Sequence, residues 1–194
     1  MAEPPTRRST ISRLPVSAES SARISGQAGL REVMARFATG VTVLTAPGER
    51  GHGMTANAFT SVSLEPPLVL CCVSRAARMH EAIVSANSFA VSILGSGQEA
   101  TARYFADWRR PRGQAQFEQV DCTPGPRTGA PLLDGALAWL ECALTEVHAG
   151  GDHSIFVGEV LHAGRGAAGE ALLFNNGRFE RTGARGTGDR RATG

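Results

Sequence analysis

The 194-residue sequence contains no lysine, and all 20 of its Lys+Arg residues are arginine. This absence excludes the phosphate-binding lysine of a Walker A motif, a lysine Schiff base and a lysine general base. Any bound anion must therefore be held by arginine, histidine, hydroxyl groups or backbone N–H groups. Aromatic residues are scarce at 6%, whereas 23 glycines and 10 prolines indicate a fold with many turns.

Cysteine pairs and long apolar runs are also missing. The four cysteines show neither CxxC nor metal-ligand spacing, and we expect free thiols, no metal site and a cytoplasmic location. No apolar stretch approaches the ~20 residues of a membrane-spanning helix. Arg7-Arg8 is not followed by the apolar segment of an export signal. We therefore expect no interaction with a membrane.

The charge is unevenly distributed along the chain. Eight arginines lie in residues 1–26 and 181–194, while residues 27–180 carry twelve arginines and fifteen acidic residues. An acidic body is unsuited to nucleic acid, so we expect no such partner. The length predicts a single domain over residues 27–180, and the two ends are expected to be flexible tails.

The hydrophobic pattern predicts a mainly β protein with flanking helices. Apolar residues at helical spacing predict a helix over residues 27–38, and two further helices are expected at 76–86 and 98–108. Residues 109–130 are polar and rich in proline and glycine, which predicts a long loop. Strands are expected at residues 41–46, 51–55, 68–73, 89–94, 136–148, 153–162, 172–174 and 178–179. Because short turns or short helices connect most of these strands, we expect an antiparallel barrel.

Two segments are candidates for a cofactor site. Residues 95–100 match G-x-G-x-x-A between an expected strand and helix, as in a dinucleotide-binding turn, but repeated βαβ units are missing. A glycine-assisted turn is the simpler interpretation. The second segment, residues 53–67, has hydroxyls and an amide that suit a planar ring with a phosphate tail. An edge strand rich in hydroxyl groups would have the same composition. The hydroxyl and amide residues of this segment are Thr55, Asn57, Thr60, Ser61 and Ser63.

Five segments together resemble the flavin reductase family. These are short NAD(P)H:flavin oxidoreductases that supply reduced flavin to two-component monooxygenases. The resemblance implies a split β-barrel of the antiparallel, Greek-key, FMN-binding type, a homodimer, and a flavin near the subunit interface. The matching segments are FATGVTVLTA (37–46), GMTANAFTSVSLEPPLVLCCV (53–73), FAVSIL (89–94), LECALTEVHAGGDHSIFVGEV (140–160) and LLFNNGRF (172–179).

The resemblance also implies where the flavin binds. Asn57 would offer its amide to the polar edge of the ring, and Arg78, with Arg75 as an alternative, would bind the phosphate. Phe89 would contact the flavin or pack in the core. The expected flavin-binding residues are Thr39, Gly40, Val41, Thr42, Thr55, Ala56, Asn57, Ser61, Cys72, Val73, Ser74, Arg78 and Phe89.

His153, in the sequence Gly151-Asp152-His153, matches the histidine that the family places beside the nicotinamide. It is the expected catalytic residue and would orient the ring, since hydride passes directly from nicotinamide C4 to flavin N5. Asp152 is expected to cap the turn. The other histidines are expected at the surface or in packing roles, and these are His52, His80, His148 and His162.

The identity of both nucleotides stays open in the sequence. FAD or FMN fits the family, and a preference for FAD rests on the expected loop 109–130, where Arg109, Arg110 and Arg112 would reach a larger ligand. NADH is the expected reductant, with NADPH as an alternative. Two other functions are considered: a non-catalytic split-barrel module that binds flavin or haem, and a Rossmann-type dehydrogenase.

Overall fold

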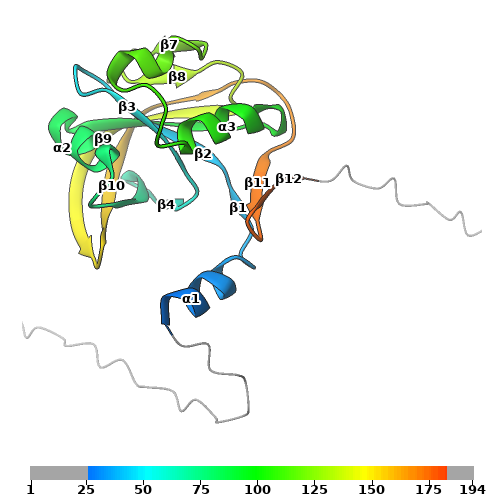
Figure 1. Ribbon diagram of the computed structural model, residues 1–194. Coiled ribbons are helices and arrows are strands. Elements are labelled where there is room, and N and C mark those ends of the chain that lie inside the picture. Colours follow the sequence, from blue (N-terminus) through cyan, green and yellow to red (C-terminus); the bar gives the residue numbers. More distant parts are fainter. Residues whose placement is uncertain (1–25, 183–194) are drawn as a thin grey trace, which may run out of the picture.

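The computed structural model describes residues 26–182 (Figure 1). The expected tails lie outside these residues, apart from Gly26 and residues 181–182. No helix within this described part is long and apolar enough to cross a membrane.

A seven-stranded sheet forms the centre of the fold, with strand order β3-β2-β6-β9-β10-β5-β4. Its two edge strands, β3 and β4, are consecutive in the chain and separated only by Asn57 and Ala58. The sheet must therefore curl until its edges meet, which produces a barrel. The strands are β2 (Thr42–Ala46), β3 (His52–Ala56), β4 (Phe59–Leu64), β5 (Pro67–Ser74), β6 (Ser88–Ile93), β9 (Ala138–Gly150) and β10 (His153–Arg165).

Two small sheets complete the strand structure. The short strand β1 (Thr39–Gly40) pairs with β11 (Leu172–Asn175), which forms a hairpin with β12 (Arg178–Arg181). Asn176 and Gly177 have φ values of 49° and 77°, as a two-residue Asn-Gly hairpin turn requires. The other small sheet pairs β7 (Cys122–Pro124) with β8 (Pro131–Leu133).

Apolar side chains are buried on both faces of the sheet, because helices cover each of them. Helix α2 (Arg78–Ala86) covers one cluster, which contains Leu44, Met79, Ile83, Phe89 and Phe156. Helix α3 (Glu99–Ala106) and the 3-10 helix η2 (Gly113–Phe117) cover the other, which contains Val43, Leu94, Phe105, Phe117 and Leu172. Strand β2 is buried along its whole length, since alternate residues enter the two clusters.

Helix α1 (Gly26–Met34) ends four residues before the expected boundary at residue 38. The carbonyl of Ala35 accepts the N–H of Asn176 (2.8 Å) from the β11–β12 turn, and this long-range bond competes with continuation of the helix. Helix α1 extends away from the barrel (Figure 1). Its apolar side chains are exposed, with 51% of Val33 accessible to solvent, and so is Phe37 in the turn that follows, at 66%.

The expectation of a long irregular loop over residues 109–130 is wrong. This segment contains η2 and β7, and the side chain of Gln116 binds it to the barrel. The oxygen of the fully buried Gln116 side chain accepts the Gly53 N–H (2.9 Å), and its nitrogen donates to the carbonyl of Gly51 (3.2 Å). The sequence conceals this order, because a buried glutamine supplies the long-range hydrogen bonds and Phe117 alone of η2 enters the apolar cluster.

The structure excludes the Rossmann alternative. Strand β6, which precedes the G-x-G-x-x-A segment, is antiparallel to both of its neighbours, and all strand pairs among residues 26–182 are antiparallel. The N–H of Gly95 donates to the side-chain oxygen of Gln98 (3.1 Å), which closes the turn locally. The segment is thus a strand-to-helix turn. Likewise, the hydroxyl-rich stretch before Pro66 forms the edge strand β4.

Candidate functional site

A cavity of about 860 Å³ opens where β1, the β3–β4 turn and β5 meet. Its volume lies within the range of about 300–1,000 Å³ that is typical of small-molecule sites. The wall combines apolar side chains with a few hydroxyl, amide and thiol groups, a surface suited to a flat ring with a polar edge. It is lined by Met34, Phe37, Ala38, Thr39, Gly40, Thr42, Asn57, Ala58, Phe59, Thr60, Leu70, Cys72 and Ile93.

Five of the residues expected to bind flavin lie in this wall, namely Thr39, Gly40, Thr42, Asn57 and Cys72. The hydroxyl of Thr42 donates to the carbonyl of Ala56 (2.8 Å) and so joins β2 to β3. The hydroxyl of Thr39 is buried and has no hydrogen-bond partner in the described part of the chain. A buried hydroxyl without a partner costs free energy, and a polar ligand atom in the cavity would remove that cost.

Other expected flavin-binding residues do not line the cavity. Val41, Val73 and Phe89 are buried in the two apolar clusters, and Ala56 is buried among the first of them. The hydroxyl of Thr55 donates to the carbonyl of Ala102 (2.7 Å) on α3. Ser61 is exposed on the edge strand, Ser74 ends β5, and Arg78 lines a second cavity.

Of the two roles expected for Phe89, contact with the flavin or packing in the core, the structure shows packing in the core. Its ring fills the space above Gly158, where an added Cβ would lie 2.7 Å from two ring carbons. Glycine is needed at residue 158 because the ring occupies the position of a side chain.

His153 follows the β9–β10 turn at the start of β10 and is paired in register with Ser74 of β5. Cross-strand partners point to the same face of a sheet, as do residues two apart on one strand. His153 therefore shares a face with Ser74 and Cys72. Two residues span about 7 Å along a strand. The register thus brings the imidazole close to the β5 wall of the cavity.

The imidazole of His153 is oriented by its neighbour in the chain. Nδ1 lies 2.9 Å from Oδ1 of Asp152, and this hydrogen bond lowers the pKa of the Asp152 carboxyl below its usual value. The carbonyl of Asp152 accepts the N–H of Arg75 (3.0 Å), which joins the hairpin turn to the end of β5. The carboxylate can only accept, so Nδ1 carries the proton and Nε2 is left to face a ligand.

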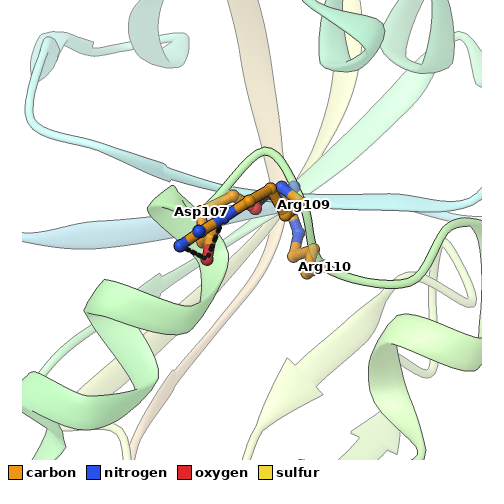
Figure 2. A network of polar contacts seen from close by, with 3 residues as sticks. All are labelled: Asp107, Arg109 and Arg110. Carbon is orange, nitrogen blue, oxygen red and sulfur yellow. Dashed lines mark hydrogen bonds and ion pairs between the residues drawn. The ribbon is translucent and has the colours of Figure 1, made fainter.

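The arginines of residues 109–112 serve different purposes. Figure 2 shows the Arg109 guanidinium folded onto the Asp107 carboxylate. The distance between Nη2 of Arg109 and Oδ2 of Asp107 is 2.9 Å. Arg110 donates to the carbonyls of Asp107 (2.8 Å) and Gly53. Both guanidinium groups are therefore engaged within the protein. Arg112, in contrast, lines a second, smaller cavity.

The cysteines and acidic groups of residues 26–182 form neither a disulfide nor a metal site. Burial raises the pKa of the Cys71 and Cys142 thiols to about 12, so neither is a thiolate near neutral pH. All four cysteines are free. Within residues 26–182 no group of three or more His, Cys, Asp or Glu side chains could hold a metal ion.

The family model for the flavin reductase like domain matches residues 34–183. The chain belongs to the flavin reductase family. The match covers most of the chain and extends over the barrel, both small sheets and the cavity wall from Met34 onward. The family and the enzyme class expected from the sequence are thereby confirmed.

Individual flavin reductases support the same assignment. An NADH-dependent FAD reductase from Streptomyces globisporus is 55% identical over 152 residues, which is 78% of this chain and 84% of that protein. The reductase component of 4-hydroxyphenylacetate 3-monooxygenase from Thermus thermophilus is 42% identical over 145 residues, covering 74% of this chain and 89% of that protein.

Solved structures of the family have the same fold. The flavin reductase component of a bacterial two-component tryptophan halogenase superposes with a TM-score of 0.79 at 48% identity, over 82% of this chain and 100% of that chain. The NADH:FAD oxidoreductase from Streptomyces globisporus C-1027, in complex with NAD and FAD fragments, gives a TM-score of 0.77 at 50% identity, over 82% and 94% of the two chains. These matches confirm the expected antiparallel split barrel.

Proposed function

We propose that this flavin reductase oxidises NADH, reduces FAD and delivers the reduced flavin to a partner monooxygenase of a two-component system. The large cavity carries the proposal, because it combines apolar walls with the unsatisfied hydroxyl of Thr39. FAD is preferred to FMN, and NADH to NADPH, because the similar Streptomyces globisporus protein is an NADH-dependent FAD reductase.

The residues of the cavity fit a flavin. The exposed amide of Asn57 can donate to and accept from the polar edge of the ring, and the hydroxyl of Thr39 would gain a partner. Leu70 and Ile93 supply apolar surface for the ring itself. Among residues 26–182, no charged side chain lines this wall. Binding by neutral groups suits a flavin that must leave after reduction.

His153 would align the two substrates rather than transfer a proton. When bound, the flavin supplies a ring whose N5 accepts hydride directly from C4 of NADH. Nε2 of His153 is free to accept a hydrogen bond from the nicotinamide carboxamide, because Asp152 occupies Nδ1. Alignment of two reacting rings is the main contribution a protein makes to such a transfer.

A second copy of the chain would complete the cavity. Met34 and Phe37 line it and are 53% and 66% exposed, and Leu30 and Val33 extend this apolar surface along α1. A contiguous exposed apolar surface beside a cofactor site is typical of a subunit interface. A homodimer in which the partner covers α1 would bury these side chains and exclude water from the flavin.

Absorbance at the NADH band tests the activity. Added FAD should stimulate NADH oxidation by the purified protein, and FMN should do so less well. Absence of stimulation by any flavin would contradict the reductase function and favour the non-catalytic binding module.

Light scattering tests the homodimer and should show a dimer. The double variant Leu30→Asp with Val33→Asp should be a monomer with weaker flavin binding.

The expected cytoplasmic location stays a prediction. The free state of all four cysteines agrees with a reducing compartment.

A further inference from the structure

His153 lies at an end of the central sheet. It directly follows the two-residue turn Gly151-Asp152, and the pairing of β10 with β5 begins at His153 and Ser74. Residues at the end of a strand have paired neighbours on one side only, and such positions open more readily than the middle of a sheet. An imidazole that aligns a substrate therefore needs support beyond the strand pairing.

The segment between β5 and α2 supplies the first support. The N–H of Arg75 donates to the carbonyl of Asp152 (3.0 Å), the residue directly before His153. This segment is itself a closed turn, because the N–H of Ala77 donates to the carbonyl of Ser74 (2.9 Å). The residue on the N-terminal side of His153 is thus bonded to the turn that leads into α2.

Helix α2 supplies the second support, through the side chain of His80. Ser154, directly after His153, is only 5% exposed, and its side chain lies on the opposite face of the sheet from the His153 imidazole. The Ser154 hydroxyl forms a hydrogen bond with Nε2 of His80, with an Oγ–Nε2 distance of 2.9 Å. The His80 ring also packs edge-on against the buried ring of Phe156, with 5.0 Å between the ring centroids. His80 therefore contacts two successive side chains on the buried face of β10.

Helix α2 is a firm base for this contact, because Met79 and Ile83 on either side of His80 are fully buried in the apolar cluster that the helix covers. The Ser154 hydroxyl is buried as well, and a buried hydroxyl that loses its partner costs free energy. The strand therefore keeps the position in which Ser154 reaches His80. The two residues that flank His153 are thus both held, one by the turn before α2 and the other by α2 itself.

We propose that His80 is a positioning residue for hydride transfer, which holds the His153 imidazole in place through its hydrogen bond with Ser154. His80 does not line the flavin cavity, so it acts through the backbone of β10 and not by contact with a ligand. The inference rests on the proposed function, in which His153 lies beside the nicotinamide. It adds a residue on the far face of the sheet to the set that determines NADH binding.

Steady-state kinetics of the full chain test the proposal. His80→Leu removes the hydrogen bond and keeps an apolar side chain in the cluster. It should raise the KM for NADH by about threefold to tenfold and change the KM for FAD by less than about twofold. Ser154→Ala removes the other half of the same bond and should have the same effect. His80→Gln should restore most of the NADH affinity, because an amide can donate to or accept from the hydroxyl.

Two further variants separate positioning from a general loss of stability. Ile83→Val removes a buried methylene group from the next turn of α2, and it should lower the urea midpoint of unfolding while leaving both KM values unchanged. In a His153→Ala background, His80→Leu should leave the KM for NADH unchanged, because the side chain that it positions is gone. An equal rise in this KM with and without His153 would overturn the proposal.

NMR of the His153 ring, recorded without substrates, tests the same link independently of activity. Ser154→Ala, which removes no ring, should broaden or shift the His153 resonances, and Ile83→Val should not. Unchanged His153 resonances in both Ser154→Ala and His80→Leu would overturn the proposal even in an active enzyme. If these resonances respond but the protein oxidises no NADH with any flavin, the link between His80 and His153 stands and the proposed function fails.

Discussion

The Asp152 carboxylate lies 2.9 Å from Nδ1 of His153 at the tip of the long β9–β10 hairpin, where the register pairs His153 with Ser74. Two local features thereby orient one imidazole. The carboxylate determines which nitrogen carries the proton, and the strand pairing determines which face of the sheet the ring occupies. The ring is thus aimed to the same side as Cys72 in the cavity wall.

His153→Ala should therefore raise the KM for NADH about tenfold, the effect of losing one good hydrogen bond, and the KM for flavin by much less. Steady-state kinetics with each substrate varied in turn measure this difference. His148→Ala, on the same hairpin, is the control and should behave as the unmodified protein. An effect on the flavin KM alone would remove His153 from the nicotinamide site.

Thr39→Val should weaken flavin binding by about threefold to tenfold, since it removes the hydroxyl expected to bind the ring. It should not lower the free energy of unfolding of the flavin-free protein, because that hydroxyl has no partner there. Thr45→Val is the contrast: the Thr45 hydroxyl donates to the carbonyl of Pro131 (2.7 Å), and its loss should cost about 1 kcal/mol without changing flavin binding. Fluorescence titration and urea unfolding provide both values. Equal flavin affinity in Thr39→Val and the original protein would contradict the role given to Thr39.

Glu141→Gln should lower the free energy of unfolding by about 2–3 kcal/mol. The fully buried Oε1 of Glu141 accepts from the N–H of Arg127 (3.0 Å) and from the N–H and hydroxyl of Thr128 (2.8 and 2.9 Å). An amide at this position would place either a donor or a single weaker acceptor against these donors. Urea denaturation measures the loss.

The exposed Glu146 on the same strand is the matched control for Glu141, and Glu146→Gln should change stability by less than about 0.5 kcal/mol.

The stability that Glu141 contributes should decrease as the pH falls. Burial raises the pKa of Glu141, but the hydrogen bonds from Thr128, Arg127 and His162 outweigh it and lower the pKa overall. Its contribution to stability is therefore present above the pKa of the unfolded chain and is lost as the pH falls through the lowered value. Equal acid sensitivity of Glu141→Gln and the original protein would contradict this account.

His52 should make the protein less stable as the pH falls from about 6.5 to 4. Burial and the charges of Arg110 and Arg78 lower its pKa in the folded state from 6.5 to about 4. Between these values the unfolded chain binds a proton that the folded chain does not, so acid favours unfolding. Thermal unfolding at a series of pH values should show a shallower decline for His52→Gln.

The fold class and most of the longer strands could be predicted from the sequence because they depend on local patterns, whereas the short strands β1, β7 and β8 were not expected. The apolar run before Ser74 and the alternating hairpin strands indicate strands over a few adjacent residues, and the structure confirms them. The order around Gln116 could not be predicted in this way. Its amide forms hydrogen bonds with Gly51 and Gly53, more than sixty residues away, and the local composition does not predict such a contact.

In the candidate site, too, the sequence indicates some residues correctly and the tertiary structure decides the others. Thr39, Asn57 and Cys72 could be selected from the sequence, and the structure places all three in one cavity. Val41, Val73 and Phe89 come from the same segments but are directed into the core, because neighbouring residues of a strand point to opposite faces. A motif that includes both faces therefore overestimates the number of side chains that reach the ligand.

The sequence by itself determined that any anion must be bound without lysine, and that arginine is the cation available for this purpose. Only the tertiary structure decided which arginines are available. Arg109 is neutralised by Asp107 and Arg110 is engaged under β3, whereas Arg78 and Arg112 meet at one cavity. The physical reason is that a guanidinium binds whatever acceptor the fold brings within a few ångströms, and that acceptor can lie anywhere in the chain.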